Sequence, residues 1–204
     1  MSTIERNMYY WRKLSPEDRQ RILSKRKAQQ RPWHSPPHKT CGGRYMLTAS
    51  CFEHAYIIGT SPQRMADFEE TLLEVLDSSV IAIYAWAVLP NHYHALVSLK
   101  NTEPVIGKLA RLHGRSSYSW NREDNVRGRQ VWCGAAETRM KSDRHFWSSL
   151  NYILHNPVKH GYAKKWTDWP FSNAASYLAD VGKEKAAELW REHDISAMGD
   201  DWDL

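Results

Sequence analysis

The chain is poor in cysteine and has no long apolar run. Its 204 residues include only three cysteines, Cys41, Cys51 and Cys133, an odd number without CxxC spacing, which argues against a disulfide framework and against a cysteine zinc cage. No apolar run approaches the roughly 20 residues that a membrane-spanning helix needs, and mean hydropathy is -0.66. The N-terminal sequence MSTIERNMYYWRK lacks an apolar secretory segment. We therefore expect a cytoplasmic protein with reduced thiols and no membrane partner.

Positive charge is concentrated in two blocks of the chain. Residues 1–50 contain eleven Lys and Arg against three Asp and Glu, and residues 104–165 contain twelve against four. From Lys183 onward the balance reverses, with three basic residues against seven acidic ones. Two basic blocks indicate an anionic partner, with nucleic acid as the first candidate. Ordinary clustering of solvated charge explains the same pattern equally well.

Apolar periodicity and turn residues predict four strands and three helices in the central part of the chain. In order, we expect a strand over 44–58, a helix over 61–78, strands over 80–89 and 92–99, a helix over 103–121, a strand over 130–140 and a helix over 142–156. Pro157 is expected to stop the last helix. This order matches an α+β, ferredoxin-like βαββαβ sandwich, with an antiparallel central sheet and helices packed on one side.

A proline-rich segment separates this core from an N-terminal extension. Ser15 and Pro16 resemble a helix start, and a basic helix to about Gln30 is expected to follow. The segment PWHSPPH after Arg31 then breaks regular structure. We expect a basic helical extension over 1–31, a main domain over 32–180 and an acidic helix or tail over 181–204.

His92 and His94 are the first candidates for a chemical site. They lie two residues apart in a predicted strand, so both imidazoles point to the same face. The opposite face is the more apolar one and should pack on the helices, which leaves the histidines on the open side of the sheet. Two neutral imidazoles form half of a divalent-metal site. An HxH pair alone is weak evidence for one.

Tyr152 lies in the middle of a polar face of the helix predicted over 142–156. The residues of this face are His145, Ser148, Ser149, Tyr152, His155 and Asn156. A helical tyrosine is usually an amphipathic edge residue, but the neighbours of Tyr152 form hydrogen bonds, and Asn156 follows one turn later as a possible third metal ligand. His145 and His155 are candidates for phosphate contacts, although helix histidines that face solvent usually have no role.

Two sets of motifs resemble a known family. The stretch LPNHYHALV over 89–97 resembles the HUH motif of one-tyrosine transposases, where U is a bulky residue. The stretches RHFW (144–147), NYI (151–153), HNPV (155–158), HG (160–161) and WPFS (169–172) are similar to the signature of REP-associated tyrosine transposases. This resemblance runs from about residue 32 to residue 177. Tyr93 departs from it, because a smaller apolar residue is expected there.

The resemblance implies a reaction and a role for each site residue. His92 and His94 would be the metal-binding pair, Tyr152 the nucleophile, and Asn156 would take the place where related transposases have a Gln ligand. The reaction would be cleavage and rejoining of hairpin-forming single-stranded DNA through a 5′-phosphotyrosine intermediate. A neutral ligand set completed by a DNA phosphate suits Mg²⁺ or Mn²⁺. The expected location is the bacterial cytosol, associated with the nucleoid, and the resemblance leaves monomer and dimer open.

Basic residues ahead of the Tyr152 helix are candidates for phosphate contacts. These are Arg111, Arg115, Arg122, Arg127, Arg129 and Arg144. The resemblance adds the segment before the first strand, with His34 and His38. Trp120 and Trp132 could stack on unpaired bases, but core packing is slightly favoured for both.

Two other functions remain open from the sequence. A domesticated, non-mobile hairpin-DNA-binding protein would keep the DNA contacts with little or no strand transfer. An RNA-binding ferredoxin-like domain would need exposed aromatic residues on the sheet face that is assigned to the histidines. The combination of His92, His94, Tyr152 and Asn156 favours the enzyme, since a pure binding protein has no need of all four.

Overall fold

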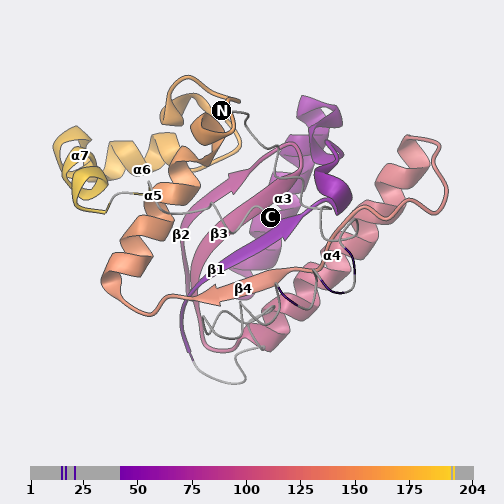
Figure 1. Cartoon of the computed structure of the whole chain (residues 1–204), viewed down its shortest axis with the longest axis horizontal. Coiled ribbons are helices and arrows are strands. Elements are labelled where there is room, and N and C mark those ends of the chain that lie inside the picture. The colour runs from indigo at the N-terminus through magenta and orange to yellow at the C-terminus, as the bar shows by residue number, and fades with distance from the viewer. Residues whose placement is uncertain (1–14, 16, 18–20, 22–41, 194, 196–204) are drawn as a thin grey trace.

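The structure is a computed structural model that describes residues 15, 17, 21, 42–193 and 195 (Figure 1). Its strands are β1 (Gly43–Ser50), β2 (Ala82–Val88), β3 (His92–Leu99) and β4 (Ala136–Arg139). Its α-helices are α3 (Pro62–Asp77), α4 (Thr102–Glu123), α5 (Asp143–Lys159), α6 (Ala174–Val181) and α7 (Lys183–Glu192). Short 3-10 helices follow β1, as η1 (Phe52–His54) and η2 (Ile58–Thr60), and precede α6, as η3 (Trp166–Asp168).

The four strands form one antiparallel sheet in the order β2-β3-β1-β4. β1 lies between β3 and β4, and its register with β3 places Thr48 directly opposite His94. α3 connects β1 to β2, and α4 connects β3 to β4 (Figure 1). The α+β, ferredoxin-like βαββαβ order expected from the sequence is confirmed.

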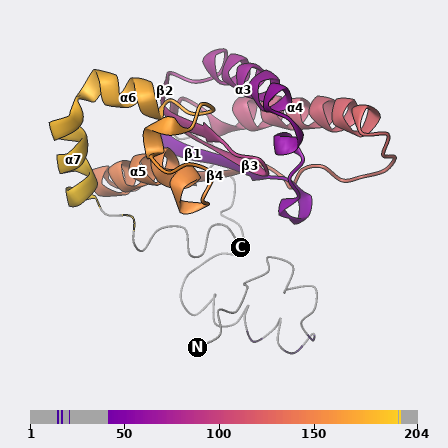
Figure 2. The ribbon, with the colours of Figure 1, turned by 90° about the horizontal axis from the view of Figure 1, so that it is seen from above.

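Helices cover both faces of the sheet. Figure 2 shows α3 and α4 as one layer over the sheet, and this layer buries the β3 residues Tyr93, Ala95, Val97 and Leu99, as expected. The other face packs Met46, Ala87 and Leu96 against Phe146, Leu150, Ile153 and Leu154 of α5. The prediction that the helices lie on one side only is therefore wrong, because the apolar side of α5 packs on the second face of the sheet.

Side-chain caps at the helix starts explain why these boundaries could be found from the sequence. The Ser61 hydroxyl accepts a hydrogen bond from the Arg64 N–H at 3.1 Å, directly before Pro62 at the start of α3. The Ser142 hydroxyl does the same for the His145 N–H at the start of α5, again at 3.1 Å. Each cap satisfies an N–H group that has no partner within its helix.

The end of α5 differs from the expectation, because the helix continues through Pro157 to Lys159. Proline removes the donor that would pair with the Ile153 carbonyl. The next turn still forms, since the His160 N–H donates to the Asn156 carbonyl at 3.0 Å. Asn156 therefore remains in helical register, one turn after Tyr152.

Two strands are shorter than expected. β1 ends at Ser50 because Glu53 and His54 adopt left-handed backbone conformations, with φ of 58° and 47°, which an extended strand cannot contain. β4 is limited to Ala136–Arg139, the stretch that pairs with β1. The earlier part of the expected strand over 130–140 contributes only an isolated bridge between Cys51 and Trp132.

The terminal parts of the chain are described only in part. α7 falls within the segment that was expected to be an acidic helix or tail. The predicted N-terminal helix is outside the described residues except at 15, 17 and 21, and His34, His38 and residues 196–204 also lie outside them. None of the helices in the described part has both the length and the apolar character needed to cross a bilayer.

Candidate active site

His92 and His94 are buried between the sheet and α5. β3 directs both side chains to the face that α5 covers, where they are 3% and 1% exposed. Their ring centroids lie 5.0 Å apart. The expectation that they face an open side of the sheet is wrong, because α5 occupies that side. The two imidazoles therefore lie side by side in an environment with little water.

Each imidazole has a polar partner at Nδ1. The Asn91 Oδ1 atom lies 2.7 Å from Nδ1 of His92, and because an amide oxygen can only accept, Nδ1 carries the proton and Nε2 presents a lone pair. The Thr48 hydroxyl lies 2.8 Å from Nδ1 of His94. A hydroxyl can donate or accept, so this contact permits either tautomer of His94.

α5 brings Tyr152 and Asn156 to the histidine pair. The Tyr152 ring lies edge-on to the His94 ring with a centroid separation of 5.4 Å. Oδ1 of Asn156 lies 3.1 Å from Nε2 of His92. Tyr152 and Asn156 are both 0% exposed. The four residues selected from the sequence for metal binding and nucleophilic attack thus form one buried cluster.

Two polar atoms of this cluster, on His94 and Asn156, have no hydrogen-bond partner among the described residues. These buried atoms are Nε2 of His94 and Nδ2 of Asn156. Nε2 of His92 is an acceptor when Nδ1 donates to Asn91, yet the atom facing it, Oδ1 of Asn156, is also an acceptor. Rotation of the Asn156 amide, which would bring Nδ2 to donate to Nε2 of His92, resolves this contact, as would a proton or a cation between the two atoms. Unsatisfied buried polar groups are uncommon and often mark functional sites.

The electrostatic environment keeps His94 neutral. Burial is the main cause that lowers the pKa of His94 well below its ordinary value of 6.5, and His92, His160 and Lys159 lower it further. A neutral imidazole retains a lone pair that can bind a cation. Among the described residues, no group of three or more His, Cys, Asp or Glu side chains is arranged to hold a metal ion. A cation at this site would therefore depend on amide or outside ligands in addition to the two histidines.

Four neighbours of the site were not predicted from the sequence. Asn91 and Thr48 contact the histidine rings, and Lys159 and His160 lie at the end of α5, with Lys159 Nζ 5.1 Å from the Tyr152 ring centroid. The His160 ring centroid lies 5.1 Å from that of His92. Asn91 could have been selected because it immediately precedes the HxH pair. Thr48 could not, since only the pairing of β1 with β3 brings it to His94.

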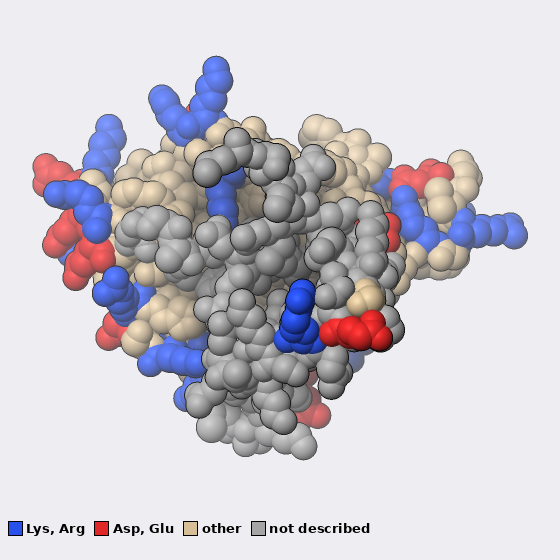
Figure 3. All heavy atoms as spheres, in the orientation of Figure 1, with Lys and Arg blue, Asp and Glu red and all other residues tan. Residues whose placement is uncertain are grey.

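The arginines chosen for DNA contacts are spread over the molecule. Arg111, Arg115 and Arg122 are exposed on α4, which packs on the sheet face opposite the histidines, and Arg127 is exposed in the following loop. Arg144 is exposed in the first turn of α5, the helix that also carries Tyr152. Figure 3 shows the described basic side chains at separate places around one face rather than in a single patch. The structure therefore does not gather these six residues at the candidate site.

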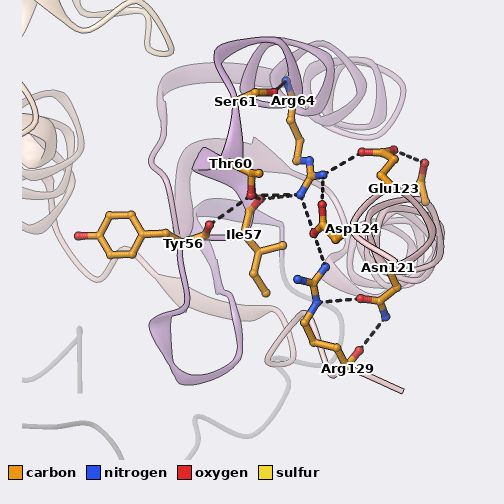
Figure 4. A network of polar contacts seen from close by, with 10 residues as sticks. Tyr56, Ile57, Thr60, Ser61, Arg64, Asn121, Glu123, Asp124 and Arg129 are labelled. Carbon is orange, nitrogen blue, oxygen red and sulfur yellow. Dashed lines mark hydrogen bonds and ion pairs between the residues drawn. The ribbon is translucent and has the colours of Figure 1, made fainter. Parts of the chain in front are cut away.

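Arg129 belongs to a network that joins α3 to the end of α4 (Figure 4). Its Nη2 lies 2.7 Å from Asp124 and its Nε donates to Asn121 at 2.8 Å. Arg64, only 8% exposed, pairs with the same Asp124 and with Glu123. The hydrogen bond from Arg64 is the largest cause that holds the pKa of Asp124 at about 2. The Arg129 guanidinium thus binds groups of the protein itself, which argues against a role in binding DNA phosphate.

The remaining candidates lie apart from the cluster. His145 lies two helical turns before Tyr152, where its Nδ1 accepts from the Lys141 N–H at 3.3 Å. His155 lies between the rings of Trp166 and Trp190. Neither position places the imidazole against Tyr152. Trp120 and Trp132 are 6% and 7% exposed and pack in the core, so the preference for core packing is confirmed.

Comparison with known proteins gives relatives of one kind. A REP-associated tyrosine transposase of Haemophilus influenzae is 31% identical over 134 residues, which cover 57% of this chain and 70% of the relative. A REP-associated tyrosine transposase of Escherichia coli is 24% identical over 132 residues, covering 64% of this chain and 76% of the relative. No family model matches the chain.

A solved structure has the same fold. It is a REP-associated tyrosine transposase bound to a REP hairpin, and it superposes with a TM-score of 0.56 at 22% sequence identity, covering 76% of this chain and 89% of that one. At this identity the likeness establishes the fold alone. The family follows from the Haemophilus influenzae relative, which combines the higher identity with coverage of most of its length. The chain belongs to the REP-associated tyrosine transposases.

Proposed function

We propose that this protein cleaves and rejoins hairpin-forming single-stranded DNA, with Tyr152 as the nucleophile. The observation that carries the proposal is the burial of His92, His94, Tyr152 and Asn156 in one cluster, with polar atoms that lack complements. A core chosen for stability alone would avoid such a cluster, because each buried unsatisfied group costs free energy. Membership of the family supports the same reaction class.

The cluster fits a divalent cation such as Mg²⁺ or Mn²⁺. The His94 Nε2 atom has no hydrogen-bond partner among the described residues, and Nε2 of His92 lies 3.1 Å from Oδ1 of Asn156. We infer that these three atoms would hold the cation, which would then offset the otherwise unfavourable acceptor pair. All three ligands are neutral, so a substrate phosphate oxygen would complete the site. When bound, the cation would neutralise charge on that phosphate oxygen.

Tyr152 would act by in-line attack on phosphorus. Its Oη atom forms the new P–O bond and loses its proton, while the bond from phosphorus to the 3′ oxygen breaks and that oxygen takes up a proton. The DNA is then held by its 5′ phosphate on Tyr152, with a free 3′ hydroxyl. Attack by a 3′ hydroxyl reverses the step and joins strands without an external energy source, because the phosphodiester is conserved. Lys159, close to the Tyr152 ring, would help to hold the negatively charged strand there.

A second candidate function is a hairpin-binding protein that no longer cuts. The complete burial of Tyr152 favours this alternative, because a phosphodiester must reach the hydroxyl before attack can occur. The enzyme therefore requires a local opening around α5 when DNA binds, while the binding protein does not. This difference makes covalent capture of DNA the decisive measurement.

The test is incubation of the full chain with labelled hairpin oligonucleotides and Mn²⁺, followed by denaturing electrophoresis. We expect a covalent protein–DNA adduct with the wild type and none with Tyr152→Phe, which keeps the ring contact with His94 but removes the nucleophilic oxygen. Tyr118→Phe is the matched control, since it removes the hydroxyl of a tyrosine that is exposed on α4, on the opposite face of the sheet. Absence of an adduct with hairpins from the source genome would support the binding protein, and an adduct with Tyr152→Phe would show that another residue attacks.

A further inference from the structure

A cavity lies on the side of α5 away from the candidate active site. It has a volume of about 480 Å³ and is formed where α5, η3, α6 and α7 meet at one end of the molecule (Figure 1). Neither Tyr152 nor Asn156 lines it, whereas His155 of the same helix does. The cavity is thus distinct from the candidate active site but shares α5 with it. Its size falls within the range of small-molecule sites in proteins.

Aromatic rings form part of the wall of this cavity. The lining includes Trp166, Trp190, Tyr177 and His155. The His155 ring is stacked at 4.9 Å and 21° on Trp166 and lies 3.6 Å and 32° from Trp190. The indole faces that His155 does not cover can stack on another planar group, and such stacking tolerates any base.

The polar groups of the cavity suit a nucleotide. Lys183 and Arg191 line it and are exposed, and no carboxylate occurs in its described lining. Nδ1 of His155 lies 3.0 Å from the Asn151 carbonyl, and because a carbonyl oxygen can only accept, Nδ1 is the donor. The Tyr177 hydroxyl is buried with no hydrogen-bond partner in the described structure.

We propose that this cavity binds one unpaired nucleotide of a single-stranded DNA, with the base against the indole rings and the phosphate near Lys183 and Arg191. The identification of DNA as the ligand rests on the proposed function, while the choice of an unpaired nucleotide rests on the flat aromatic walls and the cationic rim. A paired base would present its edges rather than its faces to these walls. Because α5 carries both sites, a nucleotide held here fixes the position of the strand relative to Tyr152.

Binding can be measured without cleavage in the Tyr152→Phe background. The probes are a fluorescein-labelled ten-residue oligo(dT) and the same strand with abasic sugars in place of the bases, followed by fluorescence anisotropy. We expect Trp190→Ala to weaken binding of oligo(dT) by about 5- to 100-fold and to have much less effect on the abasic strand. Trp190→Phe keeps a stacking ring and should retain most of the affinity. Tyr118→Ala, which removes an aromatic ring that is 73% exposed on α4, is the matched control and should bind normally.

Further variants keep the test decisive if Trp190→Ala fails to fold. Lys183→Glu and Arg191→Glu change exposed side chains and should weaken both probes. Strands containing 5-iododeoxyuridine should cross-link to peptides that contain Trp166 or Trp190. Equal affinity for oligo(dT) in a folded Trp190→Ala protein, or cross-links confined to residues outside the cavity, would overturn the proposal. If the wild type forms no covalent adduct with hairpin DNA, but oligo(dT) still binds in a way that depends on Trp190, the proposed reaction is wrong and the nucleotide site stands.

Discussion

The Thr48 hydroxyl on β1 lies 2.8 Å from Nδ1 of His94, the residue directly opposite it on the neighbouring strand β3. If Nδ1 donates to the hydroxyl, Nε2 of His94 presents a lone pair to the interior of the cluster. With the opposite tautomer, a buried N–H would be left without an acceptor among the described residues. In the first arrangement the lone pair of Nε2 could bind a cation. Hydrogen-bond acceptors at the other ring nitrogen orient histidine ligands in this way at metal sites.

Thr48→Val tests this relationship. Valine has nearly the same shape but cannot accept from Nδ1, so the His94 tautomer is no longer selected. We expect the affinity for Mn²⁺, measured by isothermal titration calorimetry, to fall about 10- to 100-fold. Thr48→Ser restores a hydroxyl and should bind Mn²⁺ nearly as well as the wild type. Unchanged Mn²⁺ affinity in a folded Thr48→Val protein would exclude a positioning role for Thr48.

Asn156 is expected to strengthen cation binding but to lower the stability of the cation-free protein. Asn156→Leu removes the amide that faces Nε2 of His92 at 3.1 Å and leaves an apolar side chain of similar size in a fully buried position. We expect weaker Mn²⁺ binding but a melting temperature in EDTA that is equal or higher, because the acceptor pair and the unsatisfied Nδ2 atom disappear. Asn156→Asp should instead strengthen binding of Mn²⁺, since a carboxylate adds charge to the ligand set. A lower melting temperature in EDTA for Asn156→Leu would mean that the amide stabilises the cation-free protein.

Much of the fold follows from local sequence, as α3 and β3 illustrate. Ser61 and Pro62 give the start of α3, and the alternation from His92 to Leu99 gives β3 with the correct bounds and the correct helix-facing residues. The side of the sheet that α5 covers was not predictable in this way. Its polar residues Ser149, Tyr152 and Asn156 suggested a solvent-facing stripe, yet all three are buried, and Tyr152 and Asn156 lie against the histidines.

The candidate site was predicted in its central residues but not in its surroundings. Tyr152 and the histidines stood out through helical and strand periodicity together with the family motif. Thr48 is far away in sequence and becomes a neighbour only through the register of β1 and β3. The partners of Arg129 also depend on tertiary structure, since the loop after α4 folds back onto Asp124. The periodicity of the sequence predicts which residues share one face of a helix or strand. It does not predict which side chains of different elements come into contact.

Arg144 and Arg129 should respond differently when DNA affinity is measured against salt. Arg144 is exposed on the helix of Tyr152, so Arg144→Ala should lower the slope of log affinity against log salt by about 0.7 to 0.9, depending on whether it contacts the single strand or the duplex stem. Arg129 is paired with Asp124, and Arg129→Ala should leave the slope unchanged while lowering the melting temperature. Fluorescence anisotropy with a hairpin oligonucleotide at several salt concentrations gives both slopes. A reduced slope for Arg129→Ala alone would reverse these assignments.

Arg64 is expected to be the most important member of the network between α3 and α4. Its guanidinium donates to both oxygens of Asp124 and to the Ile57 carbonyl, and it is 8% exposed. Arg64→Met leaves Asp124 with one cationic partner, and we expect a loss of about 3 to 5 kcal/mol in the free energy of unfolding. Urea denaturation measures it. The double variant Arg64→Met with Asp124→Leu should recover part of the loss, because no carboxylate then remains without its partner.

The stability of the protein should fall as the pH decreases from 6.5 to 4, and His113 is one cause. Burial lowers the pKa of His113 to about 4 from 6.5, and its Nε2 lies 3.1 Å from the Tyr93 hydroxyl in the core beneath α4. Between these two values the unfolded chain binds a proton that the folded protein excludes, so unfolding becomes more favourable. Above pH 6.5 both states are neutral and this contribution vanishes. His113→Gln keeps an acceptor for Tyr93 but cannot be protonated, so its melting temperature should decline less steeply over this window. Parallel pH curves for the wild type and His113→Gln would show that the core tolerates a charged His113.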